Sequence, residues 1–231
     1  VNYYTGQFFD LKSITEAGHE QGCMVCFDLA HAAGNIPLKL HDWEIDFAVW
    51  CTYKYLNSGP GSVAGCFVNE RHCEEDALPR FAGWWGHDKS TRFLMGPDFN
   101  PIPTAEGWQL SNPPILSLAA IKSSLDIFDR VGMEALREKS LNLTGYLLFL
   151  LSKLDHPKIS IITPQEEKDR GCQLSIRVLD NNKTLFDKIT NKGVIADWRE
   201  PGVIRIAPVP LYNSYEEMFH FVRILKESLL G

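Results

Sequence analysis

The sequence has no hydrophobic run long enough to cross a bilayer, which takes about 20 consecutive apolar residues. Its most apolar stretch, YLLFLL at 146–151, is flanked by Thr144, Lys153 and Asp155 and predicts a buried helix face. No basic segment followed by an apolar one opens the chain, so no secretory signal is visible. These absences argue against a membrane-spanning protein, and we expect no membrane partner.

Clusters of Lys and Arg are also missing. The formal net charge is -6 and the sequence pI is about 5.6. Proteins that hold nucleic acid by neutralising its phosphates carry a basic patch or stripe. We therefore expect no nucleic-acid partner.

Cysteine is sparse, with six residues in 231, too few for the disulfide framework of a small secreted protein. Cys23 and Cys26 form a CxxC pair, but the pair lies in the apolar run CMVCFDL (23–29), and no second pair follows at zinc spacing. We expect reduced, buried cysteines in a cytoplasmic protein, with no metal site. The chain does not begin with Met, and we expect the natural amino terminus to lie elsewhere.

What the sequence does contain is the alternation of an α/β protein. Residues 10–22 have apolar residues at helical spacing and end at Gly22, which predicts a helix. The runs 23–29, 44–53 and 65–69 predict strands, the first of them buried on both faces. Residues 81–113 form a long loop rich in Pro, Gly and Trp, and a loop of this length inside a compact domain is usually functional.

The second half of the chain changes character. Helices are predicted from Pro114 onward and from Met133 to Leu154, followed by strands at 158–163, 172–178 and 203–207 and helices at 183–191 and 214–229. We therefore predict three parts: residues 1–115 in a larger α/β domain, 116–154 as linking helices, and 155–231 as a small α/β domain.

Three charged residues stand beside or inside apolar runs. Asp28 ends one run and Lys54 follows another; alone, Asp28 could be a turn or cap residue and Lys54 a solvated one. Arg205 lies inside VIRIAP, where a charge must find an acidic partner or a bound anion. A pyridoxal-phosphate enzyme needs all three groups: an amine to hold the cofactor, a carboxylate at its ring nitrogen, and an Arg for the substrate carboxylate. In doubly wound sheets such groups gather at the carboxyl ends of strands.

Six segments carry a more specific pattern. They are FDLAHAAGN (27–35), CTYKYLNSGPG (51–61), GWWGH (83–87), STRF (90–93), SNPP (111–114) and RIAPVPLYN (205–213). The first two have loose relatives across aminotransferase-like enzymes of fold type I, whereas the GWWGH and STRF blocks together with the last are narrower. In order, the six resemble the signature blocks of the kynureninase family. The resemblance implies part of the large domain of a fold-type I pyridoxal-phosphate enzyme plus a small C-terminal α/β domain.

The resemblance also implies roles around the cofactor, pyridoxal 5'-phosphate. Lys54 would be the Schiff-base lysine and the base that takes the substrate's α-proton. Asp28 would pair with the ring nitrogen, and His31 would help to seat the cofactor. Tyr53 would hydrogen-bond the phosphate and could relay a proton.

Further residues would complete the site. Trp84 and Asn112 match cofactor-contacting positions that the family supplies from the neighbouring subunit, which implies a homodimer with sites at the subunit interface. Arg205 would bind the substrate's α-carboxylate, and Trp85, with Asn112, would meet its aryl ring. Without the resemblance, Trp84 and Trp85 could be ordinary core residues.

The implied activity is hydrolytic Cβ–Cγ cleavage of L-kynurenine or 3-hydroxykynurenine to anthranilate or 3-hydroxyanthranilate and L-alanine. Such a hydrolase acts in tryptophan catabolism, on the kynurenine pathway towards NAD biosynthesis. The blocks that the family supplies from an earlier part of its chain are missing here, so the piece should not form a complete site.

Other interpretations stay open. Tyr53 could be only an aromatic at a strand end, and His31 could cap a helix after Asp28. Another fold-type I enzyme is possible, a class V aminotransferase or a cysteine desulfurase; the desulfurase needs a mobile Cys in a late loop, whereas Cys172 opens an apparent strand. A truncated, non-catalytic dimerisation module is the alternative that is not an enzyme. We assign no chemistry to His87 or to His41, His72 and His156.

Overall fold

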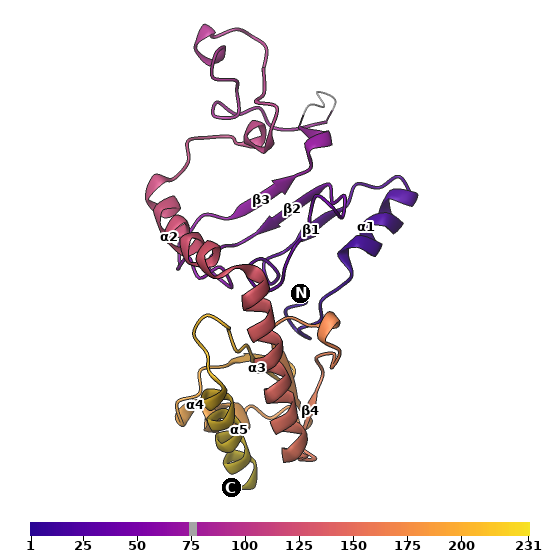
Figure 1. Cartoon of the computed structure of the whole chain (residues 1–231), viewed down its shortest axis with the longest axis vertical. Coiled ribbons are helices and arrows are strands. Elements are labelled where there is room, and N and C mark those ends of the chain that lie inside the picture. The colour runs from indigo at the N-terminus through magenta and orange to yellow at the C-terminus, as the bar shows by residue number, and fades with distance from the viewer. Residues whose placement is uncertain (74–77) are drawn as a thin grey trace. The chain divides into compact units, whose positions relative to one another are not determined.

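The computed structural model describes residues 1–73 and 78–231, and they form two compact units (Figure 1). The strand-end unit comprises Asp10–Ala33 and Leu38–Ile127, and the C-terminal unit comprises Val1–Phe9, Gly34–Pro37 and Phe128–Gly231. No helix among the described residues is both long and apolar enough to cross a membrane. The division predicted from the sequence, at residues 115 and 154, stays a prediction.

The strand-end unit is built on a three-stranded sheet in the order β1-β2-β3. β1 (Cys26–Asp28) and β2 (Phe47–Trp50) are parallel, and β3 (Gly65–Val68) runs antiparallel to β2. Helix α1 (Leu11–Glu20) precedes the sheet, and the Asp10 side chain caps its first turn by accepting from Ser13 N. All of these elements were predicted from the sequence, although the strands are shorter than the apolar runs from which they were predicted.

The predicted burial of this sheet is wrong on one face. Strand β1 was expected to be buried on both faces, but Cys26 and Asp28 are exposed and only Phe27 between them is partly buried. Cys23 and Cys66 are exposed as well, whereas Cys73 and Cys172 are buried as predicted. The apolar composition signals burial, but the described residues cover only the other face of the sheet.

The long loop between the sheet and the next helix forms a lobe, residues 78–114. It contains two short 3-10 helices, Arg92–Leu94 and Ala105–Trp108, and otherwise no regular helix or strand in its described backbone. Another 3-10 turn, Glu70–His72, follows β3. Helix α2 (Ile115–Val131) then leads on to α3 (Met133–Leu154), as predicted.

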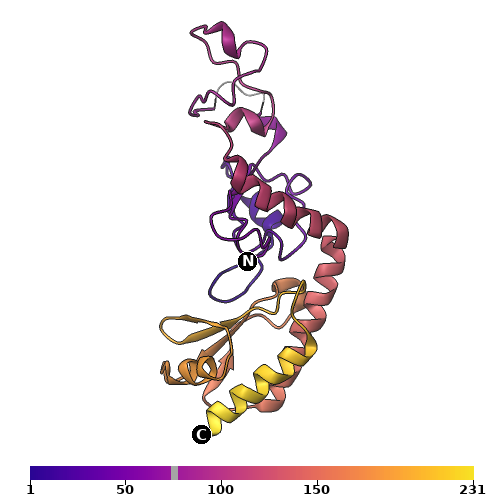
Figure 2. The same cartoon turned by 90° about the vertical axis from the view of Figure 1, so that its left-hand side faces the viewer.

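The C-terminal unit has an antiparallel sheet in the order β4-β5-β7-β6. Its strands are β4 (Ile159–Ile161), β5 (Leu174–Val178), β6 (Asp197–Arg199) and β7 (Val203–Ile206). Helix α5 (Tyr215–Leu230) runs beside α3, and α4 (Thr184–Asn191) contacts α5 (Figure 2). The core between helices and sheet is mainly apolar, with Leu143, Leu174, Ile176, Ile204 and Leu225 all at 0% exposure.

Strand β6 was not predicted from the sequence. Its three residues, DWR, carry two charges and show no apolar alternation. The strand forms because it pairs with β7, where Trp198 lies opposite Ile204. The other strands and helices of this unit were predicted within a few residues of their observed bounds.

Candidate functional site

Two predicted residues lie at the same edge of the strand-end sheet. Asp28 is the last residue of β1, and Lys54 follows the end of β2 by four residues. Because β1 and β2 are parallel neighbours with Asp28 opposite Val49, their carboxyl ends share one edge. The pairing continues past β1, since Leu29 N donates to Val49 O at 2.8 Å. The sequence predicted this edge as the place where the two groups meet.

The Asp28 side chain stabilises a turn with one carboxylate oxygen and leaves the other available. Its Oδ1 accepts from Ala30 N at 2.8 Å, which fixes the bend after the strand. The side chain is exposed, and no cation of the described residues lies within ion-pair distance of it. The turn interpretation is therefore correct, and the second carboxylate oxygen is still available to a ligand.

The loop that carries Lys54 is closed by its own hydrogen bonds. Thr52 Oγ1 donates to Val63 O at 2.6 Å, and Ser58 N donates to Thr52 O at 3.2 Å. Ser124 of α2 donates its hydroxyl to Leu56 O. These bonds hold both ends of the loop, so the half-buried Lys54 side chain projects from a defined backbone.

Tyr53 lies beside the lysine amine. Its ring is 52% exposed, and Lys54 Nζ lies 5.9 Å from the ring centroid. Charge repulsion by Cys51, together with a hydrogen bond to it, raises the pKa of the Tyr53 hydroxyl above its ordinary value. A tyrosine hydroxyl is already protonated at neutral pH at its ordinary pKa, so that of Tyr53 can donate a hydrogen bond.

His31 does not cap a helix, because the chain after Asp28 forms turns and no helix. The ring of His31 is half-buried and meets the ring of Tyr55 edge to face, with centroids 5.8 Å apart. The contact joins the loop after β1 to the loop after β2. His31 thus belongs to the same edge as Asp28 and Lys54.

The lobe carries the other predicted aromatic residues. Trp84 is 44% exposed and meets Phe93 edge to face at 5.4 Å, so the interpretation of Trp84 as a core residue is wrong. Trp85 is half-buried, and Asn112 is exposed in the segment that leads into α2. His87 contacts Thr91 Oγ1 at 3.1 Å, as a loop histidine with a hydrogen-bond partner.

Arg205 belongs to the C-terminal unit, and its predicted acidic partner is present. Asp197 of β6 lies directly opposite Arg205 of β7 and forms an ion pair with its guanidinium. Arg205 Nη1 also donates to Tyr3 O at 2.8 Å, and its side chain is only 12% exposed. The same Asp197 carboxylate pairs with Arg199 at 2.9 Å. Asp197 was not predicted from the sequence because β6, which places the acid opposite the arginine, was not predicted.

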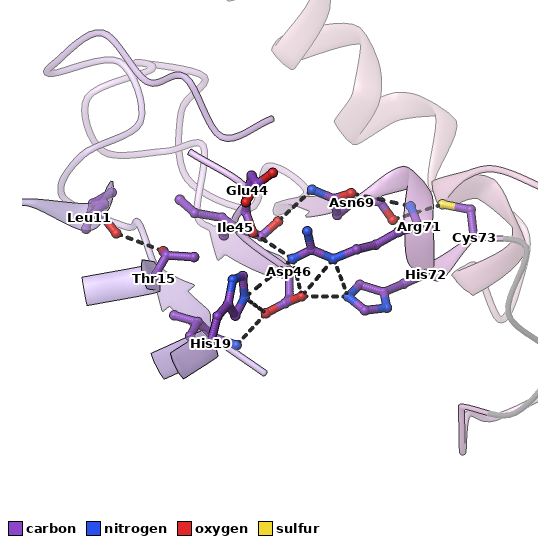
Figure 3. A network of polar contacts seen from close by, with 11 residues as sticks. Leu11, Thr15, His19, Glu44, Ile45, Asp46, Asn69, Arg71, His72 and Cys73 are labelled. Atoms are coloured by element: carbon purple, nitrogen blue, oxygen red, sulfur yellow. Dashed lines mark hydrogen bonds and ion pairs between the residues drawn. The ribbon is translucent and has the colours of Figure 1, made fainter. Parts of the chain in front are cut away.

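A second missed residue, Asp46, fixes the amino end of β2, away from Lys54. Its carboxylate is 3% exposed and accepts from Val25 N at 2.7 Å, just before β1 (Figure 3). His19 Nε2 lies 2.8 Å from Oδ2, and Oδ1 lies 2.6 Å from His72 Nε2 and 2.5 Å from Arg71 Nη2. One carboxylate therefore ties α1, β1 and the turn after β3 to the start of β2.

The electrostatics of Asp46 follow from these contacts. Burial acts to raise the pKa of the carboxyl, but the hydrogen bonds from His72, Val25 N, Arg71 and His19 outweigh it. They hold the pKa of Asp46 far below its ordinary value. Asp46 is thus a permanent anion that stabilises the sheet. His72, to which we assigned no chemistry, is a member of this network.

The C-terminal unit and the whole chain both match known proteins. Residues 136–225 match the family model "Kynureninase C-terminal domain". The chain is 59% identical over 225 residues to the kynureninase of Stenotrophomonas maltophilia and 57% identical over 223 residues to that of Koribacter versatilis. Each alignment covers 96% of this chain and 53% of the relative, so the chain spans about half the length of these relatives.

Solved structures share the fold at low identity. A cysteine desulfurase from Thermococcus onnurineus matches 100% of this chain and 58% of its own, with a TM-score of 0.80 and 17% identity. The cystine C-S lyase C-DES matches 97% of this chain and 58% of its own, with a TM-score of 0.79 and 18% identity. At these identities the likeness establishes the fold, that of fold-type I enzymes, and no activity.

Proposed function

This chain belongs to the kynureninase family as a carboxy-terminal portion, and from that premise we propose that the whole protein cleaves L-kynurenine or 3-hydroxykynurenine. The proposed reaction is hydrolysis of the Cβ–Cγ bond, which yields anthranilate or 3-hydroxyanthranilate and L-alanine. The main support is an identity of 57–59% to kynureninases over 96% of the chain. The desulfurase alternative is supported only by a shared fold, with 15–17% identity between this chain and the desulfurases compared.

The residues at the strand-end edge fit pyridoxal 5'-phosphate. Asp28 and Lys54 stand at one sheet edge, and neither forms an ion pair with any described residue. The Lys54 amine is therefore available to the aldehyde of the cofactor, and a carboxylate oxygen of Asp28 is available to its ring nitrogen. When bound, the cofactor would supply an electron sink for the carbanion formed at the substrate's α-carbon.

Each residue would then have a defined task. Lys54 would hold the cofactor and move the α-proton, and Asp28 would keep the ring nitrogen protonated. His31 would seat the cofactor beside Asp28. Tyr53, whose hydroxyl is protonated at neutral pH, would donate to the phosphate and could relay a proton during the hydrolytic step.

Substrate binding would use the remaining predicted residues. Arg205 would grip the α-carboxylate with its fork of N–H groups, oriented for this by Asp197. Trp85 and Asn112 would meet the aryl ring, and Trp84 and Asn112 would reach the cofactor of a neighbouring subunit. Residues 1–115 would form part of the cofactor domain, and 155–231 the small domain.

A homodimer is the proposed assembly, and exposed apolar residues support it. Phe93, Leu94 and Met95 follow Trp84 in the lobe and are each 75–77% exposed. A run of three large apolar side chains in contact with water is typical of a surface that a partner covers. The six free cysteines fit the reducing cytoplasm as the proposed compartment.

The test uses the full-length protein with pyridoxal phosphate. Kynurenine should give anthranilate, read by fluorescence, and alanine in equal amounts. Lys54→Ala should lose both the product and the visible absorption of the bound cofactor, whereas Lys39→Ala, at an exposed lysine, should keep both. Sulfide from cysteine or a keto acid from alanine, without anthranilate, would establish one of the enzyme alternatives. Absence of cofactor binding and of every product would establish the non-catalytic module.

A further inference from the structure

Arg92 of the lobe carries a buried charge that has no acidic partner among the described residues. The residue is 8% exposed, and no carboxylate of the described residues forms an ion pair with it. A buried charge is costly unless strong hydrogen bonds or aromatic faces replace its lost hydration. The groups around Arg92 must therefore replace the hydration that its guanidinium has lost.

Those groups are the two tryptophans and the backbone between them. Arg92 Nη2 donates to Trp85 O at 2.7 Å and to His87 O at 2.9 Å. Its Cζ lies 5.8 Å from the ring centroid of Trp84 and 5.0 Å from that of Trp85. A single planar guanidinium thus contacts both indoles and two carbonyl oxygens, an arrangement that a lysine ammonium cannot reproduce.

The tryptophan segment, residues 83–87, is also fixed by close backbone packing. A Cβ on Gly83 would lie 2.2 Å from Leu110 Cα, and one on Gly86 would lie 2.6 Å from Gly107 O. Ile102 N donates to Gly86 O at 2.9 Å. The tryptophan segment therefore lies directly against residues 107–110, which lead into Asn112.

With the backbone held by this packing, the orientation of the indoles depends on side-chain contacts. Trp84 is 44% exposed, and besides the guanidinium its ring meets Phe93 edge to face. The lobe has no long helix or strand beneath it. A cavity of about 270 Å³ adjoins the guanidinium and is lined by Trp84, His87, Arg92 and Phe99 among others. Without the guanidinium the ring of Trp84, which lines this cavity, would have room to turn. The ring of Trp85 would lose the cation that lies 5.0 Å from its centroid.

We propose that Arg92 is a positioning residue that orients Trp84 and Trp85 and thereby sets recognition of the substrate's aryl ring. The proposal rests on the proposed function for the part that concerns substrate. In this role Arg92 acts through its contacts with the tryptophan segment and does not itself bind substrate or cofactor. Its effect on catalysis passes through the indole rings, so its loss should change KM for kynurenine more than kcat.

The experiment compares Arg92→Ala and Arg92→Lys with Lys89→Ala in the full-length holoenzyme. Lys89 is the matched control, because it carries the same charge in the same lobe with a side chain 74% exposed. Both Arg92 variants should raise KM for kynurenine about tenfold, within the range of couplings between contacting residues, with a much smaller change in kcat. Lys89→Ala should behave as the parent enzyme.

Two further measurements separate positioning from general damage. In a Trp85→Phe background the effect of Arg92→Ala on KM should become smaller, because one of the two indoles through which Arg92 acts is gone. Guanidinium ion at low, non-denaturing concentration should partly restore KM in Arg92→Ala, since the adjoining cavity gives it access, and should leave Lys89→Ala unchanged. If Arg92→Ala does not fold, Arg92→Lys carries the same comparisons without rescue.

The outcomes distinguish this proposal from the proposed function. Near-UV circular dichroism of the cofactor-free protein reports the indole environment without any turnover, and Arg92→Ala should reduce it whereas Lys89→Ala should not. If kynurenine proved not to be a substrate but this signal fell, the orienting role would stand and the proposed function would fail. Equal KM values for Arg92→Ala and Lys89→Ala, or a full Arg92 effect in the Trp85→Phe background, would overturn the positioning role.

Discussion

Neutralising Asp46 should destabilise the protein without touching the proposed site. Asp46→Asn keeps the shape of the side chain but removes the charge that Arg71 and His72 face, at a position only 3% exposed. Its amide can no longer accept on both oxygens, so one partner, such as the Val25 N–H, loses its acceptor. The two losses act on the same buried group.

The magnitude follows from the environment of each partner. Breaking a buried ion pair costs about 3–5 kcal/mol, and a buried donor without an acceptor costs about 1–3 kcal/mol. Arg71 is 38% exposed and can turn towards water, which lowers the first cost. We therefore expect Asp46→Asn to reduce the free energy of unfolding by about 3 kcal/mol at pH 7.

The pH dependence gives the sharper test. The pKa of Asp46 is depressed in the folded state, so the folded protein binds fewer protons than the unfolded chain as the pH falls. The stability due to the charge is complete above the ordinary carboxyl pKa of about 4 and is lost as the pH falls towards the folded value. The difference between parent and Asp46→Asn should therefore be largest at pH 5 and above and should shrink below pH about 4.

Urea unfolding at pH 5 and pH 3, followed by circular dichroism, measures both quantities. Asp42→Asn is the matched control, because that carboxylate is 69% exposed and should change stability by less than about 0.5 kcal/mol. A loss for Asp46→Asn as small as that of the control would refute the argument. So would a large loss of the same size at both pH values, because the charge would then not be its cause.

Three other predictions concern single groups. Asp28→Asn should keep the turn bond from Ala30 N and the stability of the fold, yet lower kynurenine cleavage by about 10²–10⁴-fold, and an unchanged rate would remove Asp28 from the cofactor ring. Asp197→Asn should remove the ion pair that orients the Arg205 guanidinium and raise KM for kynurenine about tenfold, as steady-state kinetics can check against the parent. Ser214→Ala removes half of the capping box with Glu217 at α5 and should cost about 1 kcal/mol in thermal unfolding, with activity unchanged.

Local patterns were sufficient to predict the helices, most strands and the shared edge of Asp28 and Lys54. Apolar runs mark strands, and parallel neighbours put their carboxyl ends together whatever their exact length. The apolar pattern does not show whether other parts of the protein pack on each face of the sheet, so the exposure of Cys26 and Cys66 was not predicted. Burial on one face depends on parts of the fold that a local run of residues cannot report.

Contacts between polar residues far apart in the sequence were also not predicted. Asp46 lies between Ile45 and Phe47 in an apolar run, and its partners His19 and His72 are 27 and 26 residues away. Nothing at those distances distinguishes a buried histidine from a solvated one in the sequence. Arg205 was the exception, because a charge inside an apolar strand demands a partner even before the partner is known.

The two ends of β2 have separate supports, and this separation bears on catalysis. Asp46 holds the amino end, whereas Lys54 at the carboxyl end is held by the bonds of Thr52 to Val63 and Ser58. The strand between them is paired on both sides, with Ala48 at 0% exposure. A loss at Asp46 should therefore lower the fraction of folded molecules and leave the turnover of each folded molecule unchanged. If Asp46→Asn slowed kynurenine cleavage under conditions where it is fully folded, the two ends of β2 would be coupled and the supports would not be independent.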